Sequence, residues 1–70
     1  MNITIEITVR DLVLRSSNVA TVLDSLKKLD VKEDSILEVG AVITSFVLSA
    51  SDMQSKSICG MYTRITKDVQ

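Results

Sequence analysis

Histidine, tryptophan and proline are absent from this 70-residue sequence, and cysteine and glycine are scarce. Cys59 is the only cysteine, so no disulfide can form within the chain. Without histidine, a tetrahedral zinc site would lack its commonest ligands. Small domains that have neither a disulfide nor a structural metal generally gain stability by forming oligomers. We therefore expect no metal and no cofactor, and we expect the chain to form a homo-oligomer.

The same scarcity bears on catalysis. No histidine is present to act as a general base, and the sequence contains neither a glycine-rich phosphate loop nor a nucleophilic-serine motif. The acidic residues Asp30, Glu33 and Asp34 are interpreted as helix caps and dipole partners instead of general acids or bases. Cys59 is interpreted as an inert thiol. We expect that the chain is not an enzyme, and we assign no catalytic residue.

Apolar side chains are abundant for so short a chain. Hydrophobic residues make up 46% of the sequence, whereas a domain of this size buries only about 60% of the surface that its unfolded chain exposes. Residues 1–70 can build one small domain and no more. Some apolar side chains then cannot be buried inside a single chain. This favours self-association over the alternative, a monomer with a few exposed valines.

The charge balance is close to neutral, with a formal net charge of -1. No overall positive field exists to attract nucleic acid, so nucleic-acid binding is disfavoured as a partner class, although a local basic patch would permit it. The apolar run over residues 39–50 is shorter than the ~20 residues needed to span a bilayer, and we expect no membrane partner. Residues 1–10 lack the features of a signal peptide, so a cytoplasmic location is expected.

Residues 2–10 alternate strictly between apolar and polar side chains. The apolar members are Ile3, Ile5, Ile7 and Val9, and the polar members are Asn2, Thr4, Glu6, Thr8 and Arg10. This period of two, with β-branched residues on the apolar side, predicts a strand that buries one face. The backbone of a lone strand needs a hydrogen-bonding neighbour, and an exposed apolar edge promotes aggregation. We therefore predict that this strand pairs across a homodimer.

Two helices are predicted after the strand. Over residues 17–29 apolar side chains recur at helical spacing, and one of residues 16–18 is placed to cap the start. Residues 36–50 are ambiguous because they contain many β-branched side chains. Their polar side chains fall on one narrow helical stripe, which favours a helix buried on most sides. Asp30 and Glu33 are interpreted as the capping arrangement of this second helix.

The last segment, residues 57–70, leaves two folds open. Its apolar residues share one helical face, and they are Ile58, Met61, Tyr62, Ile65 and Val69. The predicted fold class is therefore α+β, with an N-terminal strand followed by two or three helices. The segment is also rich in residues that favour sheets. The alternative is a strand-helix-strand-strand fold, a small sheet with one helix, in which residues 57–70 form a hairpin with residues 36–50.

The order strand, helix, helix over residues 2–51 resembles the ribbon-helix-helix family of small dimeric DNA-binding regulators. The resemblance implies that two N-terminal strands pair across the dimer axis and place alternate polar side chains in the major groove. The residues that would contact DNA are Asn2, Thr4, Thr8 and Arg10. Glu6 and the acidic start of the second helix depart from the family's pattern, since carboxylates there would repel phosphate.

Taken together, these patterns predict a non-catalytic small regulatory protein that acts by protein binding. We expect an adaptor, inhibitor or antitoxin type that forms a homodimer or higher homo-oligomer and binds another protein. The expected interface residues are Ile3, Ile5, Ile7, Ile43, Phe46 and Val47. The alternative from a different functional class is a DNA-binding transcriptional repressor that uses the polar face of the strand.

Overall fold

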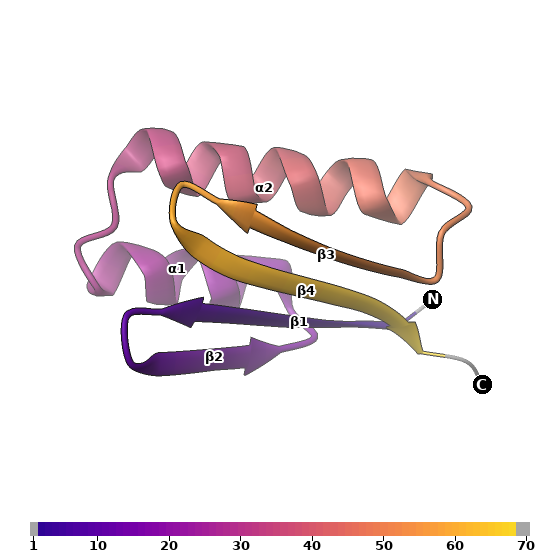
Figure 1. Cartoon of the computed structure of the whole chain (residues 1–70), viewed down its shortest axis with the longest axis horizontal. Coiled ribbons are helices and arrows are strands. Elements are labelled where there is room, and N and C mark those ends of the chain that lie inside the picture. Colours follow the sequence, from indigo (N-terminus) through magenta and orange to yellow (C-terminus); the bar gives the residue numbers. More distant parts are fainter. Residues whose placement is uncertain (1, 69–70) are drawn as a thin grey trace.

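The computed structural model describes residues 2–68, which form four strands and two helices. In chain order the elements are β1 (Asn2–Val9), β2 (Leu12–Ser16), α1 (Val19–Lys28), α2 (Glu33–Leu48), β3 (Met53–Ile58) and β4 (Met61–Asp68). The strands make one antiparallel sheet in the order β2-β1-β4-β3. Both helices lie on the same side of this sheet (Figure 1). The predicted α+β class is confirmed.

The predicted N-terminal strand is present, but its hydrogen-bonding neighbours come from the same chain. β1 turns back at residues 10–11 into β2, and its other edge pairs with β4. Ile7, for example, lies opposite Leu14 on one side and Thr63 on the other. Over Ile5 to Thr8 both edges of β1 are occupied. The backbone N-H and C=O groups of β1 therefore do not need the predicted pairing with a second copy across a homodimer.

The core lies between the sheet and the two helices. The apolar side of β1 is buried, with Ile5 and Ile7 both 0% exposed. It packs in one cluster with the inward residues of the helices and of β4, namely Val22, Leu26, Val39, Ile43, Phe46, Met61 and Ile65. Thr63 is the one polar residue buried among residues 2–68, and its Oγ1 has no hydrogen-bond partner there. The alternation in the sequence therefore marks the core of a single chain.

Helix α1 has a defined start and a defined end. The side chain of Asn18 accepts a hydrogen bond from the backbone N-H of Thr21 at 3.1 Å, which satisfies one free donor of the first turn. At the other end Asp30 has φ +60°, and the N-H of Val31 donates to the C=O of Leu26 at 3.1 Å. This is the left-handed closing turn of a Schellman motif. Asp30 therefore ends α1, and its predicted role as the cap of α2 was wrong.

Helix α2 confirms the helical interpretation for residues 36–48, and the alternative in which residues 36–50 form a strand was wrong. The expected burial on most sides was also wrong, because only the side with Val39, Ile43 and Phe46 is buried. The helix begins after Lys32, whose side chain makes no capping bond, and Glu33 and Asp34 lie in its first turn. Its last turn contains no basic residue, and the cation comes from β4. The Nζ of Lys67 donates to the C=O of Ser49 and lies 5.0 Å from the centre of the Phe46 ring.

The third helix predicted over residues 57–70 was wrong. This region forms β3 and β4, joined by a tight turn in which Cys59 and Gly60 have φ values of +50° and +82°. Two consecutive positive φ values are the requirement of a type I′ hairpin turn, and glycine meets it without strain. The alternative correctly placed strand structure here, although β4 pairs with β1 and β3 instead of residues 36–50. Val69 lies outside the described residues.

Candidate protein-interaction surfaces

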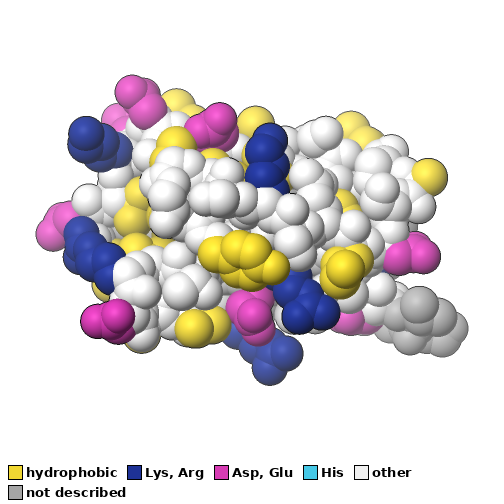
Figure 2. Space-filling view, in the orientation of Figure 1, with side chains coloured by type: hydrophobic (Ala, Val, Ile, Leu, Met, Phe, Trp, Pro, Cys, Tyr) yellow, Lys and Arg dark blue, Asp and Glu magenta, His cyan; other side chains and the backbone are white. Residues whose placement is uncertain are grey.

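The sheet has one face without helices, which we call the open sheet face. Side chains opposite each other on antiparallel neighbours share a face, so the register defines its members. They are Asn2, Thr4, Glu6, Thr8, Val13, Arg15, Met53, Ser55, Ser57, Tyr62, Arg64, Thr66 and Asp68. Figure 2 shows apolar, basic and acidic side chains intermixed across this side of the molecule. No single sign of charge dominates it.

A row of charged residues crosses the middle of the open sheet face. Glu6 lies between Arg15 on β2 and Arg64 on β4 in the register. The Nε of Arg15 is 3.6 Å from the Oε2 of Glu6, and the Arg15 side chain is 72% exposed. Such an exposed pair contributes little to stability. Arg64 forms no ion pair within residues 2–68, and its Nη2 donates only to the Sδ of Met53 at 3.7 Å. A guanidinium is therefore available for another molecule.

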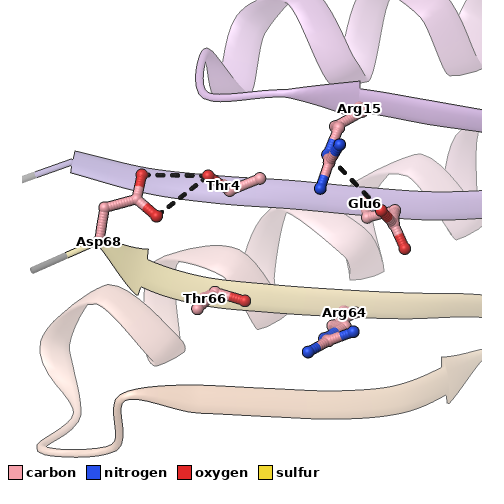
Figure 3. Close-up of a pocket in the computed structure, with 6 residues that line it drawn as sticks. All are labelled: Thr4, Glu6, Arg15, Arg64, Thr66 and Asp68. Atoms are coloured by element: carbon pink, nitrogen blue, oxygen red, sulfur yellow. Dashed lines mark hydrogen bonds and ion pairs between the residues drawn. The ribbon is translucent and has the colours of Figure 1, made fainter.

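This row borders a shallow depression of about 200 Å³. Figure 3 shows the side chains that line it: Thr4, Glu6, Arg15, Arg64, Thr66 and Asp68. The hydroxyl of Thr4 donates to the carboxylate of Asp68 at 3.0 Å, which ties β1 to the end of β4. The remaining polar groups point away from the sheet. They offer both hydrogen-bond donors and acceptors, which suits the binding of a polar surface.

Three larger side chains with apolar bodies stand around this charged row. Val13 is 55% exposed, Met53 is 53% exposed and Tyr62 is 52% exposed. Tyrosine, methionine and arginine are enriched in protein interfaces, because they bury much area and keep a polar or polarisable group for specificity. On the open sheet face these residue types lie on β2, β3 and β4, three strands of one continuous sheet. Their backbones are therefore held in place before any partner arrives.

A second exposed surface is the side of α2 that points away from the core. At 100° per residue, Leu37, Ala41, Thr44 and Leu48 fall within an arc of about 60°, opposite the buried side of the helix. Leu37 is 65% exposed and Leu48 is 82% exposed. The Oγ1 of Thr44 donates to the C=O of Gly40 at 2.9 Å, so its hydroxyl is satisfied within the helix. We call these four residues the α2 outer stripe.

The outer side of α2 is also unusual in its charge. All charged residues of the helix lie near its start, at Glu33, Asp34 and Glu38, and the ten residues Val39–Leu48 carry none. A helix that faces only solvent normally has charged side chains on its outer face. The uncharged and partly leucine-lined surface of α2 is typical of a helix that contacts another polypeptide.

The residues predicted for association are placed differently from what the sequence suggested. Ile5 and Ile7 are 0% exposed and Ile3 is 8% exposed, while Ile43 and Phe46 are each 1% exposed. These five side chains fill the core of one chain. They cannot contact a second folded copy. The sixth, Val47, is 36% exposed beside the α2 outer stripe and is available to a partner.

The residues predicted for DNA contact lie partly together. Asn2, Thr4 and Thr8 are on the open sheet face, at outward positions of β1, with Glu6 between Thr4 and Thr8. Arg10 lies in the turn between β1 and β2, with φ +56°. The sequence did not identify Tyr62 and Arg64, which occupy the strand next to β1. The alternation of outward positions 62, 64 and 66 was the available signal, and it was read as a helical pattern.

Among residues 2–68 no group of three or more His, Cys, Asp or Glu side chains is positioned to hold a metal ion. Neither α1 nor α2 has the length and apolar character needed to cross a membrane. Comparisons of the chain with models of protein families, with curated proteins and with solved structures gave no match. The open sheet face and the outer side of α2 are therefore the candidate functional surfaces of the chain.

Proposed function

We propose that this chain is a non-catalytic protein-interaction module, of the adaptor, inhibitor or antitoxin type, that acts as a homo-oligomer. Its open sheet face binds another protein. One observation carries the proposal: the open sheet face presents Tyr62, Met53 and Val13, each more than half exposed, beside the guanidinium of Arg64. These residues combine apolar contact area with a hydrogen-bonding group on a rigid sheet.

The rigidity of the sheet favours tight binding. Residues on paired strands lose little backbone freedom when a partner docks, which lowers the entropic cost of association. Tyr62 and Arg64 belong to β4, an inner strand with neighbours on both sides. Tyrosine and arginine are also among the residues that most often dominate binding energy at interfaces. We therefore assign these two side chains as the centre of the binding surface.

A protein partner fits this face better than duplex DNA does. The major groove is about 12 Å wide and admits a two-stranded ribbon, whereas the outer strands of a four-stranded sheet are about 14 Å apart. β1 is an inner strand of such a sheet. Glu6 and Asp68 also share the face with Arg15 and Arg64, so the charges nearly cancel. Docking of this face into the groove is disfavoured by both shape and charge.

The experiment is a comparative affinity capture from cells of the source organism. The wild-type chain, Tyr62→Ala, Arg64→Ala and the control Lys27→Ala serve as baits, and the bound proteins are quantified by mass spectrometry. Lys27 lies on α1, away from the sheet face. We expect one partner to be retained by wild type and Lys27→Ala and reduced at least about tenfold by either sheet variant. The purified pair should then show the same order of affinities by titration calorimetry.

Two outcomes would contradict the proposal. Equal capture by all four baits would show that Tyr62 and Arg64 do not contact the partner. Retardation of duplex DNA at ~50 mM salt, lost in Arg10→Ala but not in Tyr62→Ala, would instead support the repressor alternative.

A further inference from the structure

We infer that two copies of this chain pair through the outer side of α2, with the two helices antiparallel around a two-fold axis. The α2 outer stripe, Leu37, Ala41, Thr44 and Leu48, forms the centre of the contact. This inference rests on the homo-oligomer part of the proposed function and specifies how the copies associate. It leaves the open sheet face of each copy free for a partner.

The α2 outer stripe can pair with a second copy of itself. A two-fold interface requires each residue to meet its symmetry mate on the second copy. The four positions are symmetric about the midpoint between Val42 and Ile43. An antiparallel α2 pair therefore places Leu37 of one copy against Leu48 of the other, and Ala41 against Thr44.

The sizes of the side chains along the α2 outer stripe suit a close crossing of two helices. Ala41 and Thr44 lie at the centre, where two helix axes come closest, and the larger Leu37 and Leu48 lie towards the ends. Small residues at the crossing point let helices approach to about 8 Å. Thr44 adds no unpaired polar group, because its hydroxyl already donates to the C=O of Gly40. The flanking Val47 extends the apolar contact.

The distribution of charge along α2 favours an antiparallel pair of helices over a parallel pair. Glu33, Asp34 and Glu38 all lie in the first part of α2. A parallel pair of helices would bring the three carboxylates of both copies together, and like charges in contact repel. The antiparallel arrangement separates them. It places each acidic segment beside the end of the partner's helix, where the Nζ of Lys67 donates to the C=O of Ser49 and the backbone N-H of Lys67 donates to the C=O of Asp52.

A charge-swap experiment tests the pairing. Leu37→Glu and Leu48→Lys each place an uncompensated charge in the contact, and we expect either to raise the dimer dissociation constant at least about 100-fold. In the double variant each new carboxylate would face a new ammonium across the axis, so we expect dimerisation to recover in part at low salt. Sedimentation equilibrium measures the association, and circular dichroism checks that both single variants remain folded. Leu12→Glu, a charge at an exposed apolar position of β2 outside both candidate surfaces, is the matched control, and Val13→Glu tests association through the open sheet face.

Cysteine crosslinking fixes the direction of the helices. The background is Cys59→Ser, which removes the native thiol. In an antiparallel pair the two copies of residue 37 are about 16 Å apart along the axis, beyond the ~7 Å that a disulfide spans between Cα atoms. We expect Leu37→Cys alone not to crosslink, Ala41→Cys to crosslink with itself, and a mixture of Leu37→Cys with Leu48→Cys to form the mixed dimer. A homodimeric crosslink of Leu37→Cys would overturn the inference.

The outcomes separate this inference from the proposed function. If the chain is a dimer and both leucine variants stay dimeric, the α2 pairing is wrong and the homo-oligomer stands. If Val13→Glu alone breaks the dimer, the copies associate through the open sheet face. If the wild type is monomeric at ~100 μM, both the α2 pairing and the homo-oligomer fail. Partner capture by Tyr62 and Arg64 remains a separate measurement in each case.

Discussion

Helices α1 and α2 cover the same sheet but differ on their outward sides. Each buries an apolar face in the shared core, through Val22 and Leu26 in α1 and through Val39, Ile43 and Phe46 in α2. The outward side of α1 carries Asp24, Lys27 and Lys28, whereas the outward side of α2 carries the uncharged stripe. The inward faces of both helices are apolar because both pack into the same core. The difference outside indicates different neighbours: solvent for α1 and, as we propose, a second copy for α2.

The largest expected effect tests the claim that the inward faces are equivalent. Leu26→Ala in α1 and Phe46→Ala in α2 each remove a side chain that is at most 1% exposed. We expect a loss of about 2–5 kcal/mol in the free energy of unfolding for the first and about 3–5 kcal/mol for the second. Urea denaturation followed by circular dichroism measures both. A loss below about 1 kcal/mol in either would mean that the helix concerned does not hold the core.

The next effect compares the starts of the two helices. Asn18 accepts a bond from the N-H of Thr21, whereas Lys32 makes no side-chain cap. We expect Asn18→Ala to lower the free energy of unfolding by about 1 kcal/mol. Lys32→Ala should change it by less than about 0.5 kcal/mol. The same denaturation assay applies, and equal losses for the two variants would contradict the assignment of the caps.

The smallest effect concerns the outward side of α1. Lys28 lies one turn after Asp24, with Nζ 3.3 Å from Oδ2, and both side chains are largely exposed. We expect Lys28→Ala to cost about 0.3–0.5 kcal/mol at low salt and less at about 1 M salt, where the charges are screened. Lys27→Ala is the control, since it shares the helix end but has no carboxylate within ion-pair distance among residues 2–68. Sedimentation should show neither variant altering the association of the chain.

The sequence predicted the elements whose signals are local. The alternation from Ile3 to Val9 gives β1, and the helical spacing around Leu26 gives α1. The helix predicted over residues 36–50 is present up to Leu48. It was recognised because the polar positions of the segment share one stripe, despite a high content of β-branched residues. In each case the pattern and the structure depend on neighbours within a few residues.

The C-terminal hairpin was missed for a physical reason. Thr63 is 1% exposed and faces the core between Met61 and Ile65. A polar residue at an inward position interrupts the apolar alternation that identifies a strand, so the segment resembled a helix. β3 gave almost no signal, because most of its side chains are exposed at the edge of the sheet.

The candidate surfaces depended on information that the sequence does not carry. The exposure of Leu37 and Leu48 follows from how α2 is rotated against the sheet. The exposure of Tyr62 and Arg64 follows from the pairing of β4 with β1. The strand at Asn2–Val9 was predicted to need a partner, which was right, but the second neighbour came from the far end of the same chain. Long-range pairing of this kind is not encoded in a local pattern.

The pairing of β1 with β4 also constrains how the protein is made. Asn2 lies opposite Asp68, so β1 cannot gain its second neighbour until β4 has also been synthesised. During that interval β4 does not yet cover the apolar side chains of β1, which are Ile3, Ile5, Ile7 and Val9. Chains closed by such distant contacts fold slowly and expose aggregation-prone strands on the way. Synthesis at low temperature, which weakens apolar association, should therefore raise the share of chains that fold before they aggregate.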